Sequence, residues 1–78
     1  MAVLRLFAMA REAAGTTSAV FDAATVGDLL DVACERYGTH FSSVLDISKV
    51  WLNGEPAESD DALRDGDEVA VLPPVSGG

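Results

Sequence analysis

The stretch TVGDLLDVACERYG, residues 25–38, decides the fold because it predicts the main helix. Apolar residues recur there every three or four positions, with acidic residues on the opposite face. Thr25 followed by Asp28 predicts an N-cap close to a capping box, and Gly38 is typical of the left-handed residue that ends a helix. We therefore predict a helix over residues 26–37. Its apolar face holds Val26, Leu29, Leu30, Ala33 and Tyr37, with Leu29, Leu30 and Ala33 as the main packing residues.

Two strand-like stretches precede this helix. VLRLFAM, residues 3–9, alternates with period two, which is typical of a strand. REAAGTTS then predicts a turn around Gly15, and SAVFD, residues 18–22, predicts the returning strand of a hairpin. The alternation in residues 3–9 places one set of side chains toward the core and the other outward. The inner set is Leu4, Leu6 and Ala8, and the outer set is Val3, Arg5, Phe7 and Met9.

Three further strands are predicted after the helix. FSSVLD, residues 41–46, fits one short helical turn, and His40 before it fits a loop. ISKVWLNGEP, residues 47–56, predicts a strand followed by a hairpin at Asn53-Gly54. A turn at Asp65-Gly66 precedes the last strand, residues 68–72, which ends at Pro73 and Pro74 because neither proline can donate a ladder hydrogen bond.

The predicted order is therefore β-β-α-β-β-β. We expect an α+β fold, a ubiquitin-like β-grasp with a mixed sheet of about five strands and one main helix on one face. Residues 1–78 form a single domain, in which residues 73–78 are an extended C-terminal tail. Because one helix covers only one face of the sheet, the other face needs water or a partner.

Composition excludes several classes of function. No apolar run has the roughly 18 residues of a membrane span, and no signal peptide is recognisable, so we expect a cytoplasmic protein without membrane contact. A formal charge of −8 makes nucleic-acid binding improbable. That charge favours a partner with a basic docking face, or serves solubility alone. The single cysteine, Cys34, cannot form an internal disulfide, and with His40 it is too little for a zinc site.

No catalytic motif is present, and the acidic pairs lie in predicted turns, where aspartate is expected for backbone reasons. The C-terminal stretch PPVSGG is different, because two prolines aim an arm that ends in two glycines. Glycine lets the backbone approach a partner closely. A free carboxylate is a poor electrophile, but an acyl adenylate made from ATP has a good leaving group. We therefore expect a carrier whose Gly78 is activated by other enzymes.

LFAMAREAAG (residues 6–15), DGDEVAVLPPVSGG (residues 65–78) and the span between them resemble the small subunit of molybdopterin synthase, a family of ubiquitin-like sulfur carriers. The diglycine tail is shared by all such carriers. The pattern F-A-x-x-R-E-x-x-G is more discriminating, and its residues here are Phe7, Ala8, Arg11, Glu12 and Gly15.

The resemblance implies a cycle. An E1-like adenylyltransferase uses MgATP to adenylate Gly78, and a sulfurtransferase system converts the adenylate to a thiocarboxylate. The tail then donates sulfur to cyclic pyranopterin monophosphate inside the large subunit of the synthase, in a heterotetramer. The chain would bind no cofactor and no metal, and it would not be an enzyme on its own.

The resemblance also implies contacts to the large subunit. It gives Arg11 and Pro56 as contact positions, and it gives a tail inserted into the large subunit. Strand alternation independently places Phe7 and Leu72 outward on neighbouring strands, as an apolar patch beside the tail, and leaves Trp51 open between the outer face and the core. The predicted partner-binding residues are Phe7, Arg11, Pro56, Leu72, Pro73, Pro74, Val75, Ser76 and Gly77.

Two other functions share this fold, tail and activation. One is a sulfur carrier for cysteine or thiazole synthesis, which differs only in the sulfur acceptor. The other is a ubiquitin-like protein modifier, whose Gly78 ends in an isopeptide bond to a lysine.

Overall fold

Five strands and three helices make up residues 1–74, the part of the chain that this computed structural model describes. The strands form one mixed sheet in the order β2-β1-β5-β3-β4. The central strands β1 and β5 run parallel, and the other neighbouring pairs run antiparallel, as expected for the predicted mixed sheet. The strand bounds are β1 (Ala2–Leu6), β2 (Ser18–Phe21), β3 (Lys49–Leu52), β4 (Glu55–Pro56) and β5 (Glu68–Leu72).

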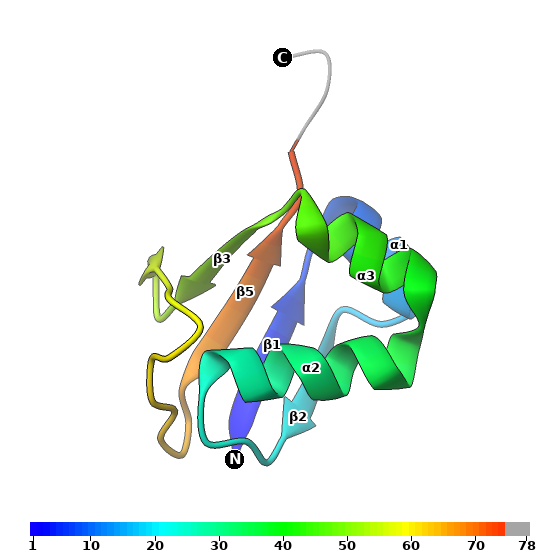
Figure 1. The fold of residues 1–78 in the computed structure, drawn as a ribbon. Helices are drawn as coiled ribbons and strands as arrows, with labels where there is room; N and C mark the ends of the chain where they lie inside the picture. Colours follow the sequence, from blue (N-terminus) through cyan, green and yellow to red (C-terminus); the bar gives the residue numbers. More distant parts are fainter. Residues whose placement is uncertain (75–78) are drawn as a thin grey trace.

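The three helices are α1 (Ala8–Ala14), α2 (Val26–Tyr37) and α3 (Thr39–Asp46), and Figure 1 shows them gathered on one side of the sheet. The bounds predicted for α2 are confirmed. Its N-cap is also confirmed, since the hydroxyl of Thr25 accepts the backbone N–H of Asp28 at 3.1 Å. None of the helices within residues 1–74 is long and apolar enough to cross a membrane.

The core lies between the sheet and the helices. Inward-facing strand residues pack there against α2 and α3, as the alternation predicts. Leu30 packs against the core as predicted, but it is half-buried, whereas Leu29 is fully buried. A helix buries only one stripe of its surface, and Leu30 lies at the margin of that stripe. The buried apolar residues include Leu4, Leu6, Val26, Leu29, Ala33, Phe41, Val44, Val69 and Val71.

The first strand is shorter than predicted. β1 ends at Leu6, and residues predicted to continue it form α1 instead. The sequence of α1, AMAREAA, consists entirely of strong helix formers, and Ala10 is buried against the core. The chain turns from strand to helix at Phe7 and Ala8, where Ala8 has φ 50°. The predicted turn at Gly15 is confirmed as the left-handed C-cap of this helix.

The segment after α2 is also more helical than predicted. α3 has eight residues instead of one short turn, and His40 lies in its first turn, not in a loop. Burial of Phe41 and Val44 gives α3 an apolar face that stabilises both turns. Gly38 separates α2 from α3 with φ 95° and ψ −174°. Its φ is positive as predicted, but its ψ is extended, a combination that essentially only glycine adopts.

The predicted hairpin at Asn53-Gly54 is confirmed. Both residues have positive φ, 50° and 85°, as a two-residue type I′ turn requires. β3 begins at Lys49 instead of residue 47, because Ile47 and Ser48 still donate their backbone N–H groups to α3 carbonyls. The final turn and β5 have the predicted positions, and the N–H of Asp67 closes that turn on the carbonyl of Arg64 at 3.1 Å.

Candidate functional site

The sheet face opposite the helices carries a continuous row of side chains. Residues in register on neighbouring strands point to the same face of a sheet. The pairings Arg5–Ala70, Ala70–Trp51 and Trp51–Pro56 therefore run across β1, β5, β3 and β4. Trp51 is half-buried on this outer face, which answers the question that the sequence left open.

Phe7 and Leu72 lie at the same end of two neighbouring strands, the end from which the tail leaves. β1 and β5 are parallel, and Leu6 is paired with Val71. The residues that follow them, Phe7 and Leu72, therefore lie at the same end of the sheet. The side chain of Phe7 is 40% exposed, and Leu72 is half-buried. Val69 and Val71 are fully buried, which confirms that Ala70 and Leu72 face outward.

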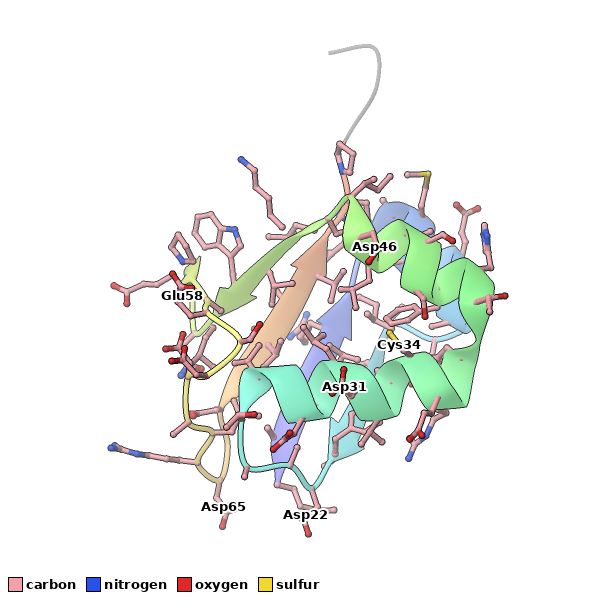
Figure 2. The ribbon with its side chains drawn as sticks, in the orientation of Figure 1. Asp22, Asp31, Cys34, Asp46, Glu58 and Asp65 are labelled. Atoms are coloured by element: carbon pink, nitrogen blue, oxygen red, sulfur yellow. The ribbon has the colours of Figure 1, made fainter. Side chains whose placement is uncertain are left out.

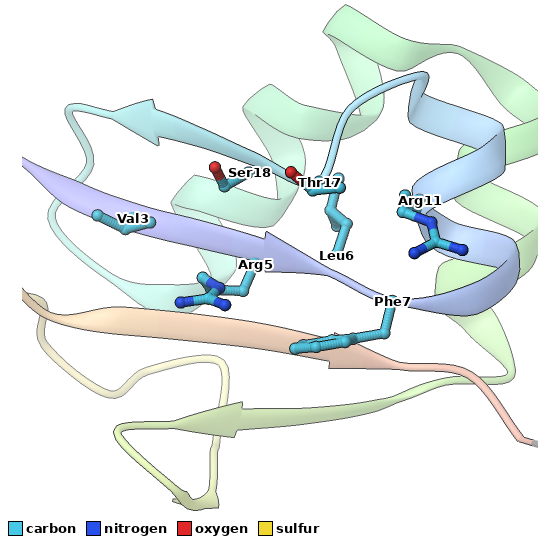
Figure 3. Close-up of a pocket in the computed structure, with 7 residues that line it drawn as sticks. All are labelled: Val3, Arg5, Leu6, Phe7, Arg11, Thr17 and Ser18. Carbon is cyan, nitrogen blue, oxygen red and sulfur yellow. The ribbon is translucent and has the colours of Figure 1, made fainter.

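Arg11 extends this end of the face from α1. Arg11 is exposed, and it lines an open hollow of about 290 Å³ together with Phe7 and Arg5 (Figure 3). Pro56 lies at the other edge of the sheet, beside Trp51. Three of the predicted contact residues therefore lie on the outer face, Phe7 and Leu72 near the tail and Pro56 on β4, and Arg11 reaches the hollow beside Phe7 from α1.

Only the base of the predicted tail belongs to the described residues. Pro73 is buried and Pro74 is exposed. The prediction of an extended tail over residues 73–78 therefore stays a prediction. Val75, Ser76, Gly77 and Gly78 lie outside the described residues.

The charge of the outer face differs from that of the whole chain. The charged strand residues that face outward are Arg5, Lys49 and Glu68, and Arg5 pairs with Glu68 at 3.4 Å. Arg11 adds another positive charge beside them, although the chain carries −8 overall. The expectation of a basic partner surface, drawn from the total charge, therefore does not extend to this face.

Acidic side chains are found on other parts of the molecule. Figure 2 shows Asp22 and Asp65 at the end opposite the tail, and Asp31 on the outer side of α2. Asp65 pairs with the N-terminal ammonium group of Met1. Within residues 1–74 no cluster of three or more histidine, cysteine, aspartate or glutamate side chains has the arrangement of a metal site.

The carboxylate of Asp67 accepts two hydrogen bonds in the turn before β5. It accepts the backbone N–H of Arg64 at 2.8 Å and the side-chain amide of Asn53 at 3.1 Å. These bonds, the backbone bond first, lower the pKa of Asp67. The amide of Asn53 also accepts the backbone N–H of Glu68 at 2.9 Å, so this network joins the β3–β4 hairpin to the start of β5.

Sequence reasoning did not identify Arg5 and Lys49 as site residues. Alternation placed Arg5 outward, and this was the available signal for it. Lys49 lies opposite Leu72 in the β3–β5 register, and strand register over 23 residues cannot be read from local periodicity.

Comparison with known proteins agrees with this architecture: residues 4–78 match the ThiS family. The chain belongs to the ThiS family. This places it among the small ubiquitin-like sulfur carriers, as the sequence resemblance predicted. The match begins within β1, at Leu4, and runs through the C-terminal glycines.

Two relatives of this ThiS-family chain have different names. A molybdopterin synthase sulfur carrier subunit of Chlamydomonas reinhardtii is 37% identical over 76 residues, which cover 92% of this chain and 92% of that protein. Small archaeal modifier protein 1 of Haloferax volcanii is 39% identical over 84 residues, covering 95% and 97% of the two chains.

Solved structures confirm the β-grasp. The crystal structure of SAMP1 from Haloferax volcanii has a TM-score of 0.87 and 38% identity, covering 99% of this chain and 98% of that one. CysO of Mycobacterium tuberculosis, at 19% identity, has a TM-score of 0.80 over 96% of this chain and 100% of its own, and it shares the fold.

Proposed function

We propose that this chain is the sulfur-carrier small subunit of molybdopterin synthase. The observation that carries the proposal is the ThiS-family match through Gly78, on a chain whose apolar Phe7–Leu72 patch lies where the tail leaves the body. The similarity to the Chlamydomonas reinhardtii carrier subunit supports molybdopterin as the product.

The proposed cycle begins with activation of Gly78. An E1-like adenylyltransferase uses MgATP to convert the carboxylate to an acyl adenylate, and a sulfurtransferase supplies the sulfur that displaces AMP. The product is a thiocarboxylate. Gly78 has no side chain that would hinder attack at its carbonyl carbon.

The second half of the cycle takes place in the large subunit. The outer face docks on the large subunit, and residues 73–78 carry the thiocarboxylate to cyclic pyranopterin monophosphate. Sulfur is transferred to the pterin, and water supplies the oxygen that regenerates the carboxylate of Gly78. In this scheme the folded body positions the tail. The sheet fixes the base of the tail, and Phe7 and Leu72 anchor the folded body to the large subunit. Two small subunits and a large-subunit dimer make up the proposed heterotetramer.

A second candidate function is protein modification. The relative named small archaeal modifier protein 1 favours it, because its likeness to this chain covers nearly the whole length of both. Both functions require activated Gly78, and they differ in whether sulfur or a lysine amine finally attacks its carbonyl.

The intact mass of the protein purified from its own cells distinguishes the two functions. We expect a species in which one oxygen at Gly78 is replaced by sulfur, located by fragmentation of the C-terminal peptide. A series of isopeptide-linked conjugates without the sulfur form would favour the modifier. Detection of only unmodified carboxylate would contradict both functions.

A further inference from the structure

An open hollow lies beside β1, between β2 and α1, next to the Arg5 end of the row of side chains on the outer face. Figure 3 shows Arg5 on one side of it and Arg11 on the other, with Leu6 between them. The hydroxyl-bearing residues Thr17 and Ser18 border it along β2. The hollow therefore combines two guanidinium groups and two hydroxyl groups with the apolar side chains of Val3 and Phe7.

The positive charge at this hollow is only partly neutralised within the protein. Among residues 1–74, Arg11 has no carboxylate within the 4.0 Å of an ion pair. Arg5 reaches Glu68 at 3.4 Å, and both side chains remain about half exposed, so water weakens that pair. Two of the five basic residues of a chain with charge −8 thus line one hollow. An anion bound in the hollow would be attracted by both positive charges.

We propose that this hollow receives an aspartate or glutamate side chain of the protein that docks on the outer face. The proposal rests on the proposed function, since the large subunit of the synthase is the docked protein. Guanidinium groups bind carboxylates with two parallel hydrogen bonds, and the hydroxyls of Thr17 and Ser18 can donate to the same carboxylate. Val3 and Phe7 give the methylene groups of the acidic side chain an apolar surface to contact.

The position of the hollow argues for a side chain of the partner. Phe7 lines the hollow and also belongs to the exposed patch at the base of the tail. A protein that covers Phe7 therefore also closes the hollow and removes both arginines from water. Burial strengthens a paired charge and penalises an unpaired one, so a partner with an acidic residue at this position is selected over one without it.

Binding of the large subunit tests the proposal with matched variants. Arg5→Gln and Arg11→Gln remove one positive charge each at the hollow, and Arg64→Gln removes one in the turn before β5, at the far end of the sheet. We expect Kd to rise about 5- to 30-fold for each hollow variant and to stay unchanged for Arg64→Gln. The difference should shrink as salt concentration rises.

A chemical coupling experiment identifies the occupant. Lys49 is the only lysine of the chain, so Lys49→Arg removes every side-chain amine while it keeps the charge. Arg5→Lys or Arg11→Lys in this background then places a single side-chain amine at the hollow. A carbodiimide joins such an amine to a contacting carboxylate as an amide. We expect coupling, in the complex, to one aspartate or glutamate of the large subunit, and none from Arg64→Lys in the same background.

Three results would overturn the proposal. One is coupling only within the chain itself, and another is the same affinity for the hollow variants as for Arg64→Gln. The third is failure of the unmodified protein to bind the large subunit, which would remove the proposed function as well. The first two leave the proposed function intact, because the parent still binds.

Discussion

Leu29 and Leu30 are adjacent in the sequence, but they differ in burial. Leu29 is completely buried, and Leu30 is half-buried at the margin of the apolar face of α2. Leu29→Ala should therefore lower the free energy of unfolding by about 2–5 kcal/mol, because it leaves a cavity in a close-packed core. Leu30→Ala should lower the free energy of unfolding clearly less than Leu29→Ala does. Urea denaturation measures both values, and equal losses would contradict the assigned buried face of α2.

Asp67 gives the stability a dependence on pH. Hydrogen bonds from Arg64 and Asn53 hold its folded pKa below the unfolded value of about 3.9. A depressed carboxyl pKa contributes stability above the unfolded pKa, and this contribution is lost as the pH falls through the folded value.

Asp67→Asn should therefore destabilise the protein at neutral pH, and its difference from the parent should disappear in acid. Asp60→Asn is the matched control, because Asp60 is exposed and loses the same charge without these two bonds. Urea midpoints from pH 7 down to about 2.5 measure the effect. A constant difference between the two variants across that range would show that the bonds to the ionised carboxylate are not responsible.

At the scale of elements, α2 depends on its N-cap. The hydroxyl of Thr25 satisfies the N–H of Asp28, one of the four amide groups without a partner at the start of any helix. Thr25→Ala should lower the free energy of unfolding by roughly 1 kcal/mol, and Thr25→Ser should retain most of it. Thermal and urea unfolding of both variants check this. If Thr25→Ser lowers the free energy of unfolding as much as Thr25→Ala does, Thr25 stabilises the protein through its methyl group and not through the N-cap hydrogen bond.

The elements differ in how well the sequence predicts them. α2 and the Asn53-Gly54 hairpin carry their own start, stop and turn residues, so local chemistry determines their bounds. α1 could not be predicted in this way, because the alternation of residues 3–6 continues by chance into Phe7, Ala8 and Met9. Burial of Ala10, a tertiary effect, favours the helix there.

The candidate site was predictable where it depends on alternation. Val69 and Val71 face inward, so Leu72 faces outward, and strand order then places it beside Phe7. The Arg5–Arg11 hollow was not predictable, because it requires the sharp bend at Ala8 that brings α1 back beside β1.

The whole molecule has one face covered by helices and one available for a partner. If Phe7 and Leu72 anchor the large subunit, Phe7→Ala or Leu72→Asp should weaken binding by on the order of 1–4 kcal/mol. Both residues are at least partly exposed, so the free variants should remain folded. Calorimetric titration, with circular dichroism as the folding control, measures this. Unchanged affinity in both variants would exclude the patch as an anchor.

The central claim is that Gly78 carries sulfur to a pterin. The most direct test is a reconstituted reaction of the Gly78 thiocarboxylate with the large subunit and cyclic pyranopterin monophosphate, with the dithiolene product quantified. We predict product in proportion to the thiocarboxylate consumed. A thiocarboxylate on a chain lacking Gly78 should form no useful product, since its reactive carbon moves back by about 3.3–3.6 Å and misplacement near 1 Å already costs about a hundredfold in rate. If the full-length thiocarboxylate binds the large subunit but yields no dithiolene, the assignment to molybdopterin synthesis is wrong.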